Sequence, residues 1–186
     1  MMYEWKCLTH GTTYCAEPCC IEWCNKKSLP PAIQGMEPDY VPKQVYLIGS
    51  LRNKNIPAIQ AEFKKHLGED VNVFADWYAA GPEADDYWQA YEKRNGFSYR
   101  QALERPAATN VFEFDRKHLL ASQAVVLIAP AGKSAHLELG WCLGQGKPGY
   151  ILLDSPDRWD VMLKFADGVE YHVEPICSAI KKELKW

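Results

Sequence analysis

A glutamate placed shortly after a turn of small residues is the first candidate for chemistry in this chain. The turn contains Gly132 and Ser134, and it opens the segment Ala-His-Leu-Glu-Leu-Gly that carries Glu138. Ser134 is predicted to be a helix N-cap, which puts Glu138 about one turn into the helix, where the helix dipole favours the ionised carboxylate. An ionised carboxylate that faces a cleft can act as a nucleophile. The alternative interpretation is a solvent-facing glutamate near a helix start.

A second polar segment, Gly49-Ser50-Leu51-Arg52, follows a short apolar run. Glycine lets the backbone approach a ligand closely, Ser50 offers a hydroxyl, and the Arg52 guanidinium can form two hydrogen bonds to a phosphate or carboxylate. We therefore expect this segment to contact substrate. Pairing of Arg52 with a neighbouring acid is the alternative.

Acids and aromatic residues alternate between residues 76 and 92, where no Lys or Arg occurs. Asp76 and Trp77 stand directly after a β-rich run, so they are the candidates here for binding a sugar hydroxyl and stacking on a planar ring. An amphipathic helix with a solvated acidic face is the alternative for the rest of the stretch.

Two further residues, Tyr46 and Asp115, have ordinary interpretations when taken alone. Tyr46 lies in an apolar run and fits a core tyrosine with a satisfied hydroxyl. Asp115 lies in a predicted helix and fits a surface acid.

Five of the seven cysteines fall within the first 24 residues. No basic segment followed by an apolar one begins the chain, so we expect no secretory signal and favour metal binding over disulfides. Zinc takes four thiolate or imidazole ligands, usually as two short pairs. A structural zinc is therefore predicted, and disulfides, iron binding or free thiols remain alternatives. The predicted ligands are Cys7, His10, Cys20 and Cys24, with Cys15 and Cys19 as alternates.

The apolar patterns around these residues predict alternating strands and helices. Strands are expected at 44–48, 71–74, 124–129, 149–153 and 169–173. Helices are expected at 57–67, 87–94, 110–121, 135–143, 158–165 and 175–184. Strands that are apolar on both faces need cover on both faces, so the fold class is α/β, a three-layer, doubly wound, flavodoxin-like sheet of five parallel strands.

Three parts are predicted along the chain. Residues 1–27 form the Cys-rich head, residues 28–42 a Pro-rich linker, and residues 43–186 the α/β domain. Ligands of such domains bind at the carboxyl ends of the strands. The loops that carry Ser50, Asp76 and Ser134 all fall at that edge.

Taken together, Tyr46-Leu-Ile-Gly-Ser50, Asp115 and the segment from Gly132 to Gly140 resemble the nucleoside 2-deoxyribosyltransferase family, with its related 2'-deoxynucleoside 5'-monophosphate N-glycosidases. The resemblance covers roughly residues 43–173. It implies that Glu138 attacks the anomeric carbon of a 2'-deoxynucleoside and forms a covalent deoxyribosyl-enzyme intermediate. It further implies that Tyr46 orients Glu138 through its hydroxyl and that Asp115 protonates or contacts the base.

Two positions matter for what the resemblance implies about substrate. Family transferases often carry an acid six residues before the nucleophile, and here that residue is Gly132. The segment from Gly49 to Arg52 is similar to the phosphate-holding loop of the relatives that hydrolyse 5'-monophosphates. The substrate is therefore either a nucleoside or a nucleotide, and the second step is either transfer or hydrolysis. A glycohydrolase acting on a nucleotide such as NAD and a non-catalytic nucleotide-binding module are the other hypotheses.

Composition excludes several other classes. The 186 residues are 47% hydrophobic, enough for a packed core, and the formal net charge of -3 argues against broad nucleic-acid binding. No apolar run reaches the roughly 20 residues that span a bilayer. We expect a cytoplasmic homo-oligomer that binds a deoxynucleoside or deoxynucleotide and a free base, with no cofactor for catalysis.

Overall fold

A computed structural model describes residues 43–155 and 159–186 of the chain. The predicted zinc ligands and the predicted linker lie outside the described residues. No helix among the described residues is long and apolar enough to cross a membrane.

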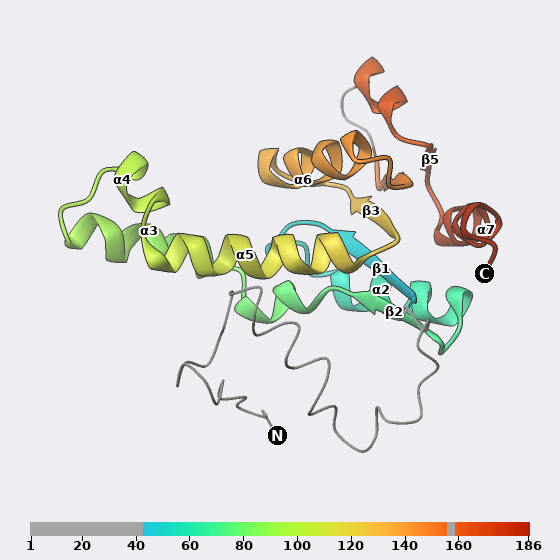
Figure 1. The fold of residues 1–186 in the computed structure, drawn as a ribbon, viewed down its shortest axis with the longest axis horizontal. Helices are drawn as coiled ribbons and strands as arrows, with labels where there is room; N and C mark the ends of the chain where they lie inside the picture. The colour runs from blue at the N-terminus through green and yellow to red at the C-terminus, as the bar shows by residue number, and fades with distance from the viewer. Residues whose placement is uncertain (1–42, 156–158) are drawn as a thin grey trace, which may run out of the picture. The chain divides into compact units, whose positions relative to one another are not determined.

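The described residues form one five-stranded parallel sheet (Figure 1). Its order is β2-β1-β3-β4-β5, the flavodoxin-like order, so the predicted fold class of residues 43–186 is confirmed. From β1 the chain adds β2 on one side and then β3, β4 and β5 on the other. Ligands of such folds bind at this topological switch point between β1 and β3. The strands are β1 (Lys43–Ile48), β2 (Val71–Phe74), β3 (Ala124–Ile128), β4 (Gly149–Leu152) and β5 (Gly168–Glu170).

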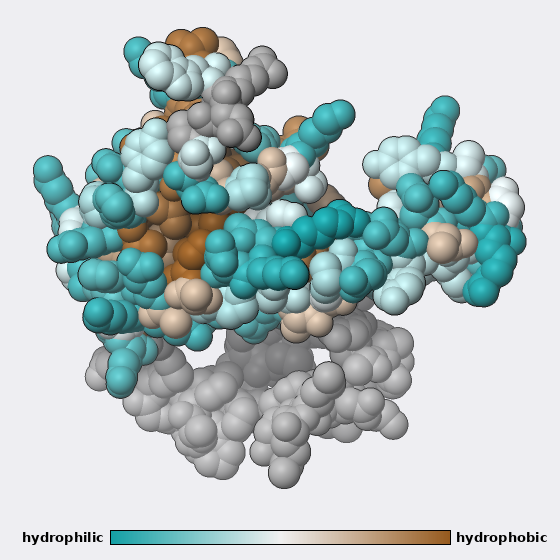
Figure 2. Space-filling model, turned by 180° about the vertical axis from the view of Figure 1, so that it is seen from behind, coloured by the Kyte–Doolittle hydropathy of each residue, from teal (hydrophilic) through white to brown (hydrophobic). Residues whose placement is uncertain are grey.

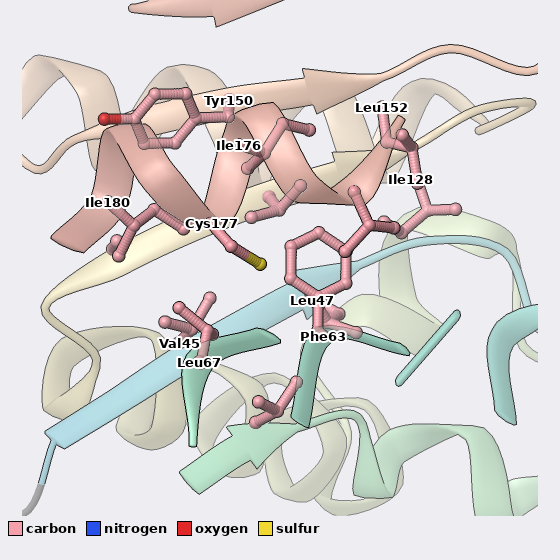
Figure 3. Packing of buried hydrophobic residues seen from close by; sticks show 14 of the residues in the cluster. Val45, Leu47, Phe63, Leu67, Ile128, Tyr150, Leu152, Ile176, Cys177 and Ile180 are labelled. Carbon is pink, nitrogen blue, oxygen red and sulfur yellow. The ribbon is translucent and has the colours of Figure 1, made fainter. Parts of the chain in front are cut away.

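Helices cover both faces of the sheet. On one face α2 (Ile56–Leu67) and α7 (Val173–Leu184) pack over residues such as Val45 and Leu47, as Figure 3 shows. On the other face Leu119 of α5 (Pro106–Ala121) and Leu139 of α6 (Lys133–Gly144) pack with Tyr46 and Ile48. Alternate residues of β1 therefore serve two separate apolar clusters, which is why the strand reads as one continuous apolar run.

Several predicted boundaries differ from the structure; helices α3 and α5, for example, begin earlier than predicted, at Ala84 and Pro106. Helix α6 begins at Lys133 with Gly132 as its N-cap, so the prediction that Ser134 caps it is wrong. In place of the helix predicted for 158–165, a 3-10 helix, η2, covers Val161–Phe165. The edge strand β5 ends at Glu170, and Val173 begins α7 because its buried side chain packs into the α2–α7 cluster.

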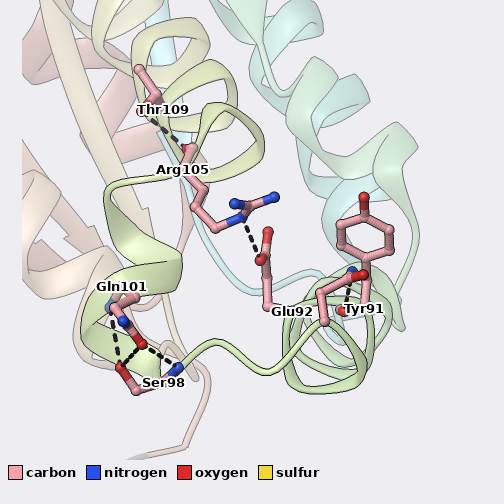
Figure 4. Close-up of polar contacts among 7 residues, drawn as sticks. Tyr91, Glu92, Ser98, Gln101, Arg105 and Thr109 are labelled. Atoms are coloured by element: carbon pink, nitrogen blue, oxygen red, sulfur yellow. Dashed lines mark hydrogen bonds and ion pairs between the residues drawn. The ribbon is translucent and has the colours of Figure 1, made fainter.

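A helical lobe extends from the sheet (Figure 1). It follows η1 (Asp76–Ala80) and consists of α3 (Ala84–Arg94), α4 (Tyr99–Leu103) and the first half of α5. Figure 4 shows its interior, where Arg105 pairs with the buried Glu92 at 2.8 Å. A capping box between Ser98 and Gln101 begins α4. The lobe therefore has local structural determinants of its own.

The carboxyl end of α5 is held by a lysine from a different element. Lys147, in the turn before β4, donates to the carbonyl oxygens of Leu119, Leu120 and Ser122 at 2.6 to 2.7 Å. These carbonyls have no partner within the helix, and a cation there also complements the helix dipole. Lys147 thus fixes the helix that carries Asp115 against the strand that follows α6.

We expect Lys147→Met to lower the free energy of unfolding by about 1–3 kcal/mol, because it leaves three carbonyls without their charged donor. Urea unfolding measures the change. Lys164→Met, at an exposed position of η2, is the control and should unfold like the parent protein. Equal urea midpoints for the two variants would contradict the capping role.

Candidate active site

A tyrosine in the sheet and a carboxylate in a helix form the centre of the candidate site. The Tyr46 hydroxyl donates a hydrogen bond to Asp115 Oδ1 at 3.1 Å. Tyr46 is 1% exposed on β1, and Asp115 is half-buried on α5, 69 residues later. Sequence reasoning gave each residue an ordinary interpretation when taken alone, and the fold brings the two into contact.

Glu138 joins these two residues from α6. Burial, with the negative charge of Asp115 as the second cause, raises the pKa of Glu138 to about 7. Glu138 is the sixth residue of α6, beyond the first turn to which the helix dipole reaches. The expectation that the dipole keeps this carboxylate ionised is therefore wrong, because desolvation and the neighbouring acid outweigh it.

The same environment acts on Asp115 and Tyr46. Burial raises the pKa of Asp115, and the hydrogen bond from Tyr46 opposes part of that rise. Burial, followed by the charges of Asp115 and Glu138, raises the pKa of Tyr46 far above its ordinary value. Tyr46 therefore keeps its proton and remains a hydrogen-bond donor. The pKa values of the two carboxyl groups beside it are both raised, so each binds a proton more readily than in water. Such a pair can supply an acid and a nucleophile at one site.

The hydroxyl of Tyr46 serves a different partner from the one that the resemblance implies. Its hydrogen bond goes to Asp115, and none to Glu138 is formed in the described part of the chain. Tyr46 thus fixes Asp115 directly, and it is coupled to Glu138 through charge.

Two aromatic residues that the sequence did not single out as site residues support the tyrosine. The Phe74 ring stacks on Tyr46 with centroids 5.1 Å apart and on His118 with centroids 4.0 Å apart. Burial lowers the pKa of His118, which favours the neutral ring in this stack. His118 is one turn beyond Asp115 on α5, so Phe74 links β1, β2 and α5 beside the site. Only the end of the β2 apolar run could have pointed to Phe74.

Cys142 lies one helical turn beyond Glu138 on α6 and is fully buried. Burial is the main reason that its pKa rises to about 11, and the charge of Glu138 adds to the rise. The thiol is therefore protonated at neutral pH and acts as an apolar neighbour of the glutamate.

The loop after β1 is held by Trp77. The indole nitrogen donates to the Leu47 carbonyl at 2.7 Å. A Cβ on Gly49 would come within 3.1 Å of the indole ring and 2.9 Å of Ile56, so glycine is required by close packing. Trp77, predicted to stack on a ligand, thus has its polar edge bound to the end of strand β1 and its ring against Gly49.

Arg52 forms the ion pair that the sequence left as an alternative. Its Nη2 lies 2.9 Å from Asp86 Oδ2, with the two side chains 58% and 66% exposed. Its backbone N–H donates to Ser50 Oγ at 3.2 Å. The pair joins the loop after β1 to helix α3 of the lobe.

The remaining predicted binding residues lie at the surface. Gly132, Ser134 and Asp76 are all exposed. A Cβ on Gly132 would meet nothing within 4 Å, so the position has room for a side chain. The Nδ1 atom of His136 lies 2.8 Å from the Gly132 carbonyl oxygen, so this ring contacts the turn before α6.

Two cavities lie near this site without including Tyr46, Asp115 or Glu138. One, of about 210 Å³, lies at the carboxyl ends of β3 and β4. The other is a groove of about 990 Å³ lined by α6, β4, η2 and α7. Figure 2 shows hydrophobic side chains gathered in a hollow below the segment that carries η2. Within residues 43–155 and 159–186, no group of three or more His, Cys, Asp or Glu residues could hold a metal ion.

No protein-family model and no curated protein sequence matches the chain. A solved structure of a 2-deoxyribosyltransferase from Bacillus psychrosaccharolyticus is similar to it, with 16% sequence identity and a TM-score of 0.49. The match covers 72% of this chain and 89% of that one. A likeness at this level carries no conclusion about activity.

Replacing Glu138 by glutamine should make the protein more stable at high pH. The folded protein raises the pKa of Glu138 from 4.5 to about 7, so ionisation costs stability as the pH rises through this range. We expect Glu138→Gln to gain about 1–3 kcal/mol at pH 8 and almost nothing at pH 4. Urea unfolding at both pH values measures this, with Glu174→Gln on the exposed surface of α7 as the control. A gain independent of pH would show that Glu138 is not a desolvated acid.

Proposed function

We propose that this protein cleaves the N-glycosidic bond of 2'-deoxynucleosides, with Glu138 as the nucleophile, and passes the sugar to another base or to water. The observation that carries the proposal is the convergence of Tyr46, Asp115 and Glu138 at one desolvated position. The motif resemblance supports it, because these are the three residues that it assigns.

The first step needs a nucleophile and a proton donor. A carboxylate oxygen of Glu138 forms a bond to the anomeric carbon, and the bond from that carbon to the base nitrogen breaks. The leaving base takes a proton from Asp115, whose raised pKa favours the protonated acid. Tyr46 holds the Asp115 carboxyl in place by donating to Oδ1.

The second step reverses the first. A nitrogen of the incoming base, or the oxygen of water, attacks the anomeric carbon, and the Glu138 carboxylate leaves. The attacking group loses its proton to Asp115, which restores the starting state. Two displacements at one carbon give net retention, which needs a nucleophile close to the sugar.

The test is an exchange assay in which the protein meets a panel of deoxynucleosides and an excess of a different free base. Chromatography should show a new deoxynucleoside for transfer or free base alone for hydrolysis. We expect Glu138→Gln to lower the rate by roughly 10³-fold or more, because no covalent intermediate can form. Glu174→Gln should retain full activity.

The pH dependence gives an independent check on the assignment. Glu138 must be ionised to attack and Asp115 must be protonated to donate, so the rate should rise with pH as Glu138 ionises and fall again as Asp115 loses its proton. Asp115→Asn has no proton to donate or lose, so the maximum rate should drop and the fall at high pH should disappear. A native protein that releases no base, or a Glu138→Gln variant that is fully active, would rule out the mechanism.

The ion pair of Arg52 bears on the choice between nucleosides and 5'-monophosphates. A 5'-phosphate that binds Arg52 has to displace the Asp86 carboxylate, which lies 2.9 Å from the guanidinium. It would then meet that carboxylate and the neighbouring acids of the α3 amino end, Asp85 and Glu83. These charges disfavour a phosphate dianion, so we propose that uncharged deoxynucleosides are the preferred substrates.

Removing the Asp86 charge should therefore improve the use of 5'-monophosphates. An exposed ion pair is worth up to about 1 kcal/mol, so we expect Asp86→Asn to raise kcat/KM for monophosphates about fivefold relative to deoxynucleosides. Asp85→Asn, which neutralises the adjacent acid without freeing Arg52, is the matched control. If the two variants shift the ratio equally, general charge, and not the ion pair, sets the preference.

A further inference from the structure

The small cavity beside the candidate active site lies where ligands of this fold class bind. Its walls come from the loop after β1, the ends of β3 and β4, and the start of α7. The ends of β1 and β3 flank the switch point of the sheet. The cavity is on the α2–α7 face, whereas Tyr46 packs in the cluster on the α5–α6 face. It is therefore distinct from the pocket that Glu138 would serve.

The base of this cavity is apolar and its polar lining is rich in acceptors. Ile59, Ile128, Leu152 and Val173 supply the apolar surface. The polar side chains are two amides, two carboxylates, an imidazole and a phenol, contributed by Asn53, Asn55, Glu62, Asp154, His172 and Tyr171.

Most of these polar side chains have no other task in the described structure. Within residues 43–155 and 159–186, no side-chain hydrogen bond or ion pair engages Glu62, Asp154, His172 or Tyr171. Carboxylates only accept hydrogen bonds, and no Lys or Arg lines the cavity. The lining therefore favours a ligand with N–H donors and disfavours a phosphate or carboxylate.

Size narrows the ligand further. The volume of about 210 Å³ lies below the roughly 300–1,000 Å³ of pockets that hold drug-sized molecules. A whole nucleotide does not fit, whereas a flat bicyclic ring does. An apolar base beneath polar side chains suits a planar heterocycle whose faces are apolar and whose edge carries the donors.

We propose that this cavity is a binding site for a free, amino-substituted nucleobase of the adenine type, separate from the site at Glu138. The identity of the ligand as a nucleobase rests on the proposed function. That it carries N–H donors and no negative charge rests on the lining alone. Asp154 and Glu62 accept from its amino and ring N–H groups. A 6-oxo ring such as hypoxanthine presents a carbonyl oxygen to these acceptors and binds more weakly.

Calorimetric titration of the full chain with adenine and with hypoxanthine tests the proposal. We expect adenine to bind about fivefold more tightly, the net effect that one typical hydrogen bond gives. Spermidine, a flexible polyamine, is the third probe. If spermidine binds more tightly than adenine, the ligand is not a planar heterocycle. If adenine binding is not detectable, the cavity is not a nucleobase site.

The double variant Glu62→Gln, Asp154→Asn should weaken adenine binding about tenfold and leave deoxynucleoside cleavage unchanged. Both residues are exposed, so the fold should tolerate the change. Glu69→Gln, an exposed acid in the turn before β2 at the opposite edge of the sheet, is the control. Equal adenine affinity in the double variant and the control would refute the assigned acceptors.

A competition experiment separates this proposal from the proposed function. Adenine is titrated into Glu138→Gln protein saturated with a deoxynucleoside, which that variant does not cleave. Adenine should still bind with unchanged affinity, and a crystal soak should place it between Ile128 and Val173. If the deoxynucleoside abolishes adenine binding, the two share one site and the proposal fails. If the deoxynucleoside neither binds nor is cleaved by the native protein, the proposed function fails, and the adenine titration alone decides this site.

Discussion

The hydrogen bond between Tyr46 and Asp115 is the interaction on which the candidate site depends. It connects a fully buried residue of the interior strand β1 to a half-buried carboxyl group on α5. The Tyr46 position in turn relies on the stack with Phe74, and the α5 position relies on Lys147 at the end of that helix. Elements distant in sequence thus converge on the placement of one carboxyl group.

Burial beside Asp115 gives Glu138 its chemical character. In water a glutamate is ionised at neutral pH and a poor partner for proton transfer. Here desolvation and the second acid raise the pKa of Glu138 to about 7, and burial also raises that of Asp115. Such a pair is costly for folding, since both groups would be better solvated in the unfolded chain. A fold that keeps this cost at the carboxyl edge of its sheet has the arrangement that acid and nucleophile chemistry requires.

The carboxyl edge of the sheet offers two different environments. On the α5–α6 side, the half-buried acids Asp115 and Glu138 lie around Tyr46. On the α2–α7 side, a small cavity presents exposed acceptors above an apolar base. Between the loop after β1 and the lobe, Arg52 is occupied by Asp86. Acidic groups therefore lie at all three of these places, which favours neutral substrates over phosphorylated ones there.

The local patterns of the sequence were sufficient for the architecture. Apolar runs on β1, β3 and β4 predicted buried parallel strands, because a strand covered on both faces has no polar side. The sequence predicted the bounds of β5 poorly, because an edge strand of three residues is defined by its pairing with β4 and is too short to show an apolar pattern of its own. Gly49 could be singled out because it directly follows β1, and Glu138 because it lies on the helix that the loop after β3 opens.

Tertiary structure decided what those residues do. Nothing in the spacing could pair Tyr46 with Asp115, 69 residues away, or assign Asp86 to Arg52. The ionisation of Glu138 was also decided by tertiary structure. Its place in the helix predicted that the dipole would favour the carboxylate, whereas burial and the charge of Asp115 raise its pKa. Hydrophobic periodicity is a local property that a sequence carries in full, whereas desolvation and charge depend on which distant groups the fold places together.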